Sequence, residues 1–140
     1  MITTRNPEWE NEPNRQQWID PATGYRCLIL KHHWGHLCGY IRVMRTHRLH
    51  GRPEKAQRLL QAHGGLNFAS NGKGVAYLKR GMWLGFDCAH AWDYVPATDR
   101  KLESLFGGFP KFMEDRKVYR NSVNVRQCLT DLALQLKYYE

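Results

Sequence analysis

The most reactive side chains of the sequence are concentrated in the segment WLGFDCAHAWD, residues 83–93. Asp87, Cys88, His90 and Asp93 lie there within seven residues. Imidazole nitrogen suits zinc and other transition metals, while carboxylate oxygen suits magnesium and manganese. We therefore expect Asp87, His90 and Asp93 to bind a divalent metal (zinc, manganese or magnesium) that would polarise a phosphoryl or carbonyl group. Without a metal, the same groups suit general acid and base catalysis.

The spacing of these residues indicates how they can meet. Because successive side chains of a strand face opposite sides, Asp87 and Cys88 share a site only if the strand ends there. His90 and Asp93 would then share one face of the following loop or helical turn. One alternative is a structural hydrogen-bonded pair of Asp87 and His90, with Asp93 as a cap. Another is a structural zinc site that uses Cys88 and His90 with a distant partner.

His63, followed by Gly64 and Gly65, is a second candidate for the site. Glycine allows the main chain to approach a ligand closely, and successive N–H groups can bind an anion. The alternative is that both glycines end a helix over residues 53–63, PEKAQRLLQAH. With the carboxylates of the first segment in reach, we expect His63 to act as a second base or ligand. The expected catalytic residues are therefore His63, Asp87, His90 and Asp93.

The neighbouring aromatic and basic residues suggest how a ligand would be held. Trp92 lies among polar residues and is the candidate for stacking on a nucleobase, whereas Trp83 and Phe86 are expected in the core. Arg120 precedes the C-terminal helix and suits phosphate binding together with the helix N-terminus; the alternative is a plain surface arginine. The expected ligand-binding residues are Gly64, Gly65, Trp92 and Arg120.

The hydrophobic pattern predicts an α+β fold, an antiparallel sheet with a long C-terminal helix packed on it. Residues 25–47 are predicted to form a strand hairpin with a solvated loop that contains His32, His33 and His36. Further strands are expected in LNFAS and in VAYLKRGMWLGFDCAH.

Two further helices and the domain limits complete the predicted organisation. Asp99 can cap a short helix, RKLESLF, and Asn121 or Ser122 can begin the C-terminal helix. That helix carries an apolar stripe of Val125, Leu129, Leu132 and Leu136. We expect residues 1–20 to be an extended N-terminal arm held by Trp9 and Trp18, and residues 21–140 to be a single domain.

The composition indicates a basic protein. Among its 140 residues, 21 lysines and arginines against 13 acidic residues give a formal charge of +8, which favours an anionic partner such as a nucleotide, nucleic acid or acidic protein surface. The four cysteines have no CxxC spacing, so the usual zinc-finger and redox signatures are missing. The polar N-terminus and the lack of a long apolar stretch predict a cytoplasmic protein without membrane contact.

The segments HGGLNF, WLGFDCAHAWD and YRNSVNVRQCLTDLALQL together resemble a family of small proteins encoded by bacteriophages and prophages. The matching positions are Gly39-Tyr40, His63 to Leu66, Gly85 to Asp93, Pro96 and Tyr119-Arg120. The resemblance brings no assigned activity. It implies a phage origin, interference with host defence, and a shared site at His63, Asp87, His90 and Asp93. Trp92 stands where the family pattern has a small residue.

Two functions are consistent with these features. The first is a small hydrolase acting on a phosphate ester, either a nucleotide signal or nucleic acid, in which the clustered ionisable residues bind a metal or transfer protons and arginines hold phosphate. The second is a binding protein without turnover, which captures a nucleotide or occupies a host defence protein through its basic surface.

Overall fold

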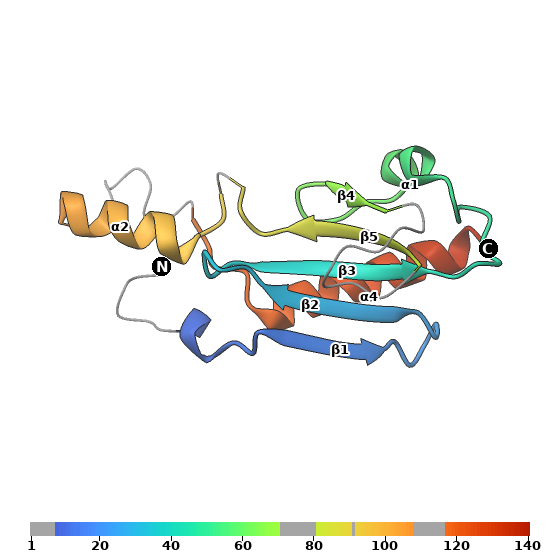
Figure 1. Ribbon diagram of the computed structural model, residues 1–140, viewed down its shortest axis with the longest axis horizontal. Helices are drawn as coiled ribbons and strands as arrows, with labels where there is room; N and C mark the ends of the chain where they lie inside the picture. Colours follow the sequence, from blue (N-terminus) through green and yellow to red (C-terminus); the bar gives the residue numbers. More distant parts are fainter. Residues whose placement is uncertain (1–7, 71–80, 91, 108–116) are drawn as a thin grey trace.

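The computed structural model describes residues 8–70, 81–90, 92–107 and 117–140 (Figure 1). Five strands form one antiparallel sheet in the order β1-β2-β3-β5-β4. The elements in chain order are η1 (Glu8–Asn11), β1 (Arg15–Ile19), β2 (Arg26–Lys31), β3 (Leu37–Val43), α1 (Pro53–Leu59), β4 (Phe68–Ala69), β5 (Met82–Asp87), α2 (Pro96–Phe106) and α4 (Ser122–Tyr138). The predicted α+β fold is confirmed.

Helix α4 covers one face of the sheet, as the sequence predicts, and lies behind β2 and β3 in Figure 1. It begins with a capping box in which the Asn121 side chain accepts from the Asn124 N–H and the Asn124 side chain accepts from the Asn121 N–H. Such reciprocal bonds satisfy main-chain donors that the first helical turn leaves unpaired. The buried stripe of α4 consists of Val125, Leu129, Leu132, Ala133 and Leu136.

The hairpin of β2 and β3 is confirmed, but α1 is shorter than predicted. The helix ends at Leu59, and Leu60 already has extended angles of φ −96° and ψ 146°. Gly64 and Gly65 therefore lie beyond the helix and do not cap it. The alternative explanation of the two glycines as a helix stop is wrong.

The N-terminal segment is not a free arm over its whole predicted length. Residues Arg15–Ile19 are extended but belong to the sheet as β1, paired with β2 from Arg15↔Leu30 to Ile19↔Arg26. This pairing satisfies main-chain groups of β2 that would otherwise be unpaired. The two tryptophans do hold the segment: Trp9 is 4% exposed, and the Arg126 guanidinium lies 3.9 Å from the Trp18 ring centroid.

The remaining predicted elements differ in their limits. The LNFAS strand is reduced to Phe68–Ala69, and the part of the next strand before Gly81 lies outside the described residues. Helix α2 begins at Pro96, earlier than predicted, and the Asp99 carboxylate accepts from the Val95 N–H at 2.7 Å. Strand β5 ends at Asp87, as the site requires. Where the chain is described, none of its helices has the length and apolar character that crossing a membrane demands.

Candidate functional site

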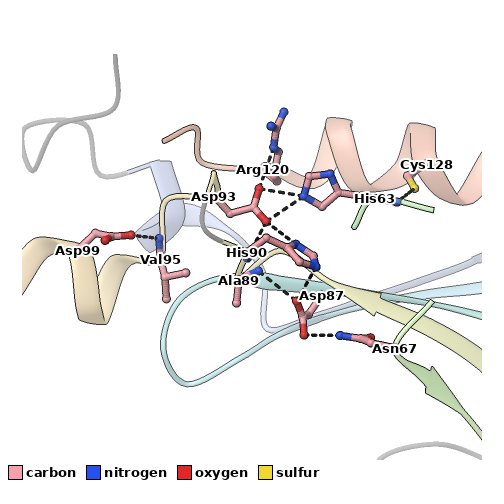
Figure 2. Close-up of polar contacts among 10 residues, drawn as sticks. All are labelled: His63, Asn67, Asp87, Ala89, His90, Asp93, Val95, Asp99, Arg120 and Cys128. Atoms are coloured by element: carbon pink, nitrogen blue, oxygen red, sulfur yellow. Dashed lines mark hydrogen bonds and ion pairs between the residues drawn. The ribbon is translucent and has the colours of Figure 1, made fainter. Parts of the chain in front are cut away.

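The buried carboxylate of Asp93 is the centre of the site (Figure 2). Its side chain is fully buried, and His63 Nε2 lies 2.9 Å from both of its oxygens. His90 approaches the same carboxylate twice, through Nδ1 at 2.8 Å and through its main-chain N–H at 3.0 Å. Arg120 Nε donates to Oδ1 at 3.0 Å. The structure therefore brings together two predicted catalytic histidines, Asp93 and the predicted phosphate-binding arginine.

These contacts keep Asp93 ionised. Burial raises the pKa of its carboxyl group, but hydrogen bonds from His63, from the main chain and side chain of His90, and from Arg120 together hold the pKa below its ordinary value. The result is a fixed negative charge between two imidazole rings at neutral pH.

Three separate segments of the chain supply these groups. His63 follows α1, and its main-chain N–H points to Cys128 Sγ of α4 at 3.4 Å. His90 and Asp93 lie in a turn after β5, closed by a bond from the Asp93 N–H to the His90 carbonyl at 2.9 Å. Arg120 comes from the segment before α4, which meets this turn through a bridge between Asp93 and Val118. The local H-x-x-D spacing thus places two groups, and the fold adds the others.

The His90 ring contacts both Gly64 and Trp92. The Trp92 and His90 rings stack with centroids 5.0 Å apart and an interplanar angle of 8°. A Cβ atom on Gly64 would overlap the His90 ring, and Gly64 has a φ of 67°. Gly64 therefore makes room for an imidazole, a role that the sequence did not indicate. Trp92 stacks on a histidine and remains 46% exposed.

Asp87 approaches His90 rather than the Asp93 carboxylate. Its Oδ1 is 3.7 Å from His90 Nε2, too far for a hydrogen bond. Asn67 Nδ2 donates to Asp87 Oδ2 at 2.6 Å, and the Ala89 N–H donates to Oδ1 at 3.2 Å. The carboxylate of Asp87 therefore faces the far nitrogen of His90 and is itself held in place. Asn67 is a member of the site that no sequence pattern singled out.

The group that could hold a metal ion differs from the predicted one. In the described parts of the chain it consists of His63, His90 and Asp93, whose ligand atoms lie within 4.8 Å of one another. His63, predicted as a further base or ligand, is a member. Asp87, which the sequence predicted as a ligand, is not a member, because it faces Nε2 of His90 whereas Asp93 contacts Nδ1. Cys88 is not a member either, so the structural zinc alternative finds no support.

The geometry of the group fits a metal centre. Its nitrogen–oxygen distances of 2.8 and 2.9 Å are a few tenths of an ångström below the ~3.3 Å that separates neighbouring ligands at ~2.0 Å from a tetrahedral ion. A small outward shift of the rings would accommodate an ion. Asp87 would then face the second nitrogen of a metal-binding histidine, a common outer partner of such ligands.

The two histidines border different cavities. His63 and Arg120 line a cavity of about 450 Å³ beside α4, together with Cys88 and Cys128. His90 lines a smaller one of about 220 Å³ that also contacts Trp34 and Lys117. Burial raises the pKa of the Cys88 and Cys128 thiols, so both are neutral side chains in the larger cavity. The ionisable groups that line this cavity besides the two thiols are His63, Arg120 and Asp131.

One loop histidine is not solvated as expected. His36 is 3% exposed, its ring stacks on His32 with centroids 4.5 Å apart, and its Nδ1 has no hydrogen-bond partner in the described structure. Burial, followed by the charge of His32, lowers the pKa of His36 to about 4. His36 is therefore neutral at physiological pH.

Comparison with known proteins does not identify the chain. No protein-family model matches the sequence, and no curated protein or solved structure matches it.

Proposed function

We propose that the protein is a phosphate-ester hydrolase whose reaction centre is formed by His63, His90 and Asp93 beside Arg120. The observation that carries this proposal is the buried carboxylate of Asp93, which orients two imidazoles and one guanidinium. Two of these groups, His63 and Arg120, line the larger cavity. Fixed histidines next to an arginine are the groups that phosphoryl chemistry needs, namely proton transfer and charge stabilisation.

Arg120 is the proposed phosphate-binding residue. Its Nε is used on Asp93, and its side chain also lines the cavity. The two terminal nitrogens of the guanidinium are then suited to a bidentate contact with phosphate oxygens. Because the ion pair with Asp93 restricts the side chain, little freedom remains to be lost when a ligand binds.

His63 is the proposed general base in the absence of a metal. With the proton of Nε2 directed at Asp93, Nδ1 is left as an acceptor, the arrangement by which a buried carboxylate sets the tautomer of a catalytic imidazole. A water molecule would give a proton to His63 while its oxygen bonds to phosphorus. The ester P–O bond breaks, and the leaving oxygen takes up the proton that His63 received, which returns His63 to its neutral form.

The same three residues could instead hold a divalent ion. Two imidazoles and one carboxylate favour zinc or manganese over magnesium, which prefers oxygen ligands and keeps its waters. When bound, such an ion supplies a water of lowered pKa and polarises the phosphoryl group. His63, His90 and Asp93 would then act as ligands, and Arg120 would keep its role at the phosphate.

The test combines metal analysis with activity. We would measure bound metal, then follow hydrolysis of a chromogenic phosphodiester and monoester after chelation and after addition of zinc, manganese or magnesium. His63→Gln and His90→Gln remove the imidazoles, and His33→Gln on the exposed loop is the matched control. Loss of hydrolysis in both site variants but not in the control supports the proposal; undiminished hydrolysis in both site variants contradicts it.

Chelation separates the two mechanisms. Activity that disappears on chelation and returns with zinc or manganese supports the metal centre. Activity that survives chelation yet disappears in His63→Gln supports metal-free proton transfer.

A binding protein without turnover is the second candidate. Four donor contacts occupy the Asp93 carboxylate. They favour this candidate because a buried group whose hydrogen bonds are all satisfied is also typical of a purely structural cluster. A nucleotide that binds and is recovered chemically unchanged would support this candidate. A phage setting and a role against host defence are supported by the sequence resemblance alone.

A further inference from the structure

A compact basic surface lies at the end of the molecule away from the candidate site. Within residues 45–58 it consists of five exposed cations, Arg45, Arg48, Arg52, Lys55 and Arg58, and Glu54 is the one exposed acidic residue of this segment. We call this surface the basic corner. None of its members forms an ion pair with an acidic side chain in the described structure. Figure 1 shows α1, which carries part of the basic corner, at the opposite end from α2.

Two adjoining cavities lie between this end of the molecule and the candidate site. The cavity at His63 and Arg120 measures about 450 Å³, and a second cavity of about 420 Å³ lies beside Leu59 and Tyr138. The two cavities share Gln61 and Gln135 as lining residues. The two cavities adjoin at these residues, between the segment after α1 and α4, and we call them together the furrow. Its charged lining includes Arg120 and Asp131.

Two hydrogen bonds join Gln61 and Gln135 where the two cavities meet. Gln135 bonds to the main chain of Gln61 in both directions, accepting from its N–H at 2.8 Å and donating to its carbonyl at 2.9 Å. At the outer end Tyr138 is 82% exposed. Arg48 of the basic corner lies 3.4 Å from the main-chain oxygen of Glu140. Arg48 therefore contacts the residue that follows the lining residue Tyr139, and Arg58 of the basic corner directly precedes the lining residue Leu59.

The length of the furrow exceeds a single nucleotide. Its lining runs along α4 from Asn124 to Tyr138, which at 1.5 Å per helical residue is about 20 Å. A free nucleotide would fill one end of this distance, whereas a chain of several nucleotides would follow it. Lysine and arginine neutralise backbone phosphates without regard to sequence, and an exposed tyrosine offers a face on which an unpaired base can stack.

We propose that the furrow along α4 binds single-stranded nucleic acid, with its backbone on the basic corner and a base on Tyr138. The strand leads toward Arg120 and His63, where a phosphodiester would be presented to the reaction centre. A single strand is favoured over a duplex because the bases of a duplex are stacked on one another and do not offer a face to Tyr138. The cleavage of the strand rests on the proposed function, but its binding does not.

The binding test uses charge reversal at two matched places. Arg52→Glu/Arg58→Glu changes the basic corner, and Arg100→Glu/Lys101→Glu makes the same change of charge on the exposed surface of α2. Fluorescence anisotropy would follow a labelled strand of about 12 nucleotides, as DNA and as RNA, alongside the corresponding duplex and a labelled mononucleotide. We expect the corner variant to weaken strand binding at least tenfold in about 0.1 M salt and to lower the salt slope by about one.

The control variants distinguish strand binding in the furrow from binding that depends on net charge alone. The α2 variant is expected to change strand binding less than twofold, and Tyr138→Ala to weaken it at least fivefold. Equal weakening by both double variants would overturn the proposal, because binding would then follow net charge alone. Duplex binding as tight as strand binding, or no strand binding at all, would also overturn it; the latter would leave an acidic protein surface as the partner of the basic corner.

Failure of this inference is distinguishable from failure of the proposed function. Hydrolysis of a small chromogenic diester is measured in the same preparations and is expected to be unchanged in the α2 variant. If the small ester is hydrolysed but the strand does not bind, the furrow proposal fails and the hydrolase stands. If the strand binds through the basic corner and is recovered intact, the hydrolase fails and the furrow proposal stands.

Discussion

The imidazole ring of His90 lies against the main chain of Gly64, in the space that a Cβ atom would occupy at that position. The indole of Trp92 stacks on the same ring in a nearly parallel orientation. Gly64, Trp92 and the bond to Asp93 together fix the orientation of His90, and Gly64 is the one position of the three that tolerates no side chain. The φ of 67° at Gly64 adds a second reason for glycine there.

Gly64→Ala is expected to displace His90 from Asp93 and to remove most of the activity. Alanine in left-handed backbone costs about 1–2 kcal/mol, and the overlap with His90 comes in addition. Denaturant unfolding and hydrolysis of a small phosphodiester would measure both effects.

The matched control for this variant is the adjacent glycine. Gly65 also has positive φ, 87°, but a Cβ there meets no atom within 4 Å. Gly65→Ala should therefore lower the free energy of unfolding by the same backbone cost but leave the position of His90 and the activity unchanged. Equal loss of activity in the two variants would show that the contact with His90 is not what matters at Gly64.

Asp93→Asn is expected to abolish activity and to lower the free energy of unfolding by about 3–5 kcal/mol, the usual cost of removing one partner of a buried ion pair. The reason is that His63, His90 and Arg120 all direct donors at this carboxylate, and an amide offers them one acceptor and an opposing NH₂ group. Glu54→Gln on the exposed surface of α1 is the control and should cost less than about 0.5 kcal/mol. Near-wild-type unfolding of Asp93→Asn would show that the cluster is not a stabilising centre.

The parts of the site that the sequence predicts are those that depend on local geometry. The joint position of His90 and Asp93 follows from a three-residue spacing. Strand alternation requires the strand to end near Asp87 if that residue is to join them, and β5 does end there. The capped start of α4 follows from the asparagine before an apolar stripe. Each of these features is decided within one turn or one strand.

The parts that the sequence does not predict are decided between distant segments. The choice of His63 over Asp87 as the partner of Asp93 depends on where the chain goes after α1, and α1 ends earlier than its helical periodicity suggests. No spacing rule links Asn67 to Asp87 or Gly64 to His90, since both contacts cross between segments. The pairing of β1 with β2 was missed because its polar, alternately exposed residues lack the signal of a buried strand.

The folding stability should depend on the protonation of His36. Its pKa falls from an ordinary 6.5 to about 4 in the folded protein. Between these pH values the unfolded chain binds a proton at His36 that the folded chain does not bind. Stability is then complete above pH 6.5 and is lost as the pH falls toward 4, by roughly 3 kcal/mol over that window. His36→Phe, which keeps a flat ring against His32, should flatten this part of the curve in urea titrations. An unchanged dependence of the unfolding free energy on pH would show that another group causes the loss of stability in acid.

Asn67→Ala is expected to reduce activity about 10–100-fold, the range typical of lost outer partners of functional histidines, while changing the unfolding free energy by no more than about 1 kcal/mol. Asn67 holds Asp87 by a 2.6 Å hydrogen bond, and Asp87 faces the outer nitrogen of His90. Without this donor the partly exposed carboxylate can turn into water. Steady-state kinetics beside Asn14→Ala, an exposed asparagine in a distant loop, would measure the effect.

The double variant decides whether Asn67 acts through Asp87. If it does, Asn67→Ala should cost little more in an Asp87→Ala background, because the carboxylate that it positions is gone. Additive losses would instead show that Asn67 and Asp87 act independently, and that the far nitrogen of His90 does not depend on how Asp87 is held.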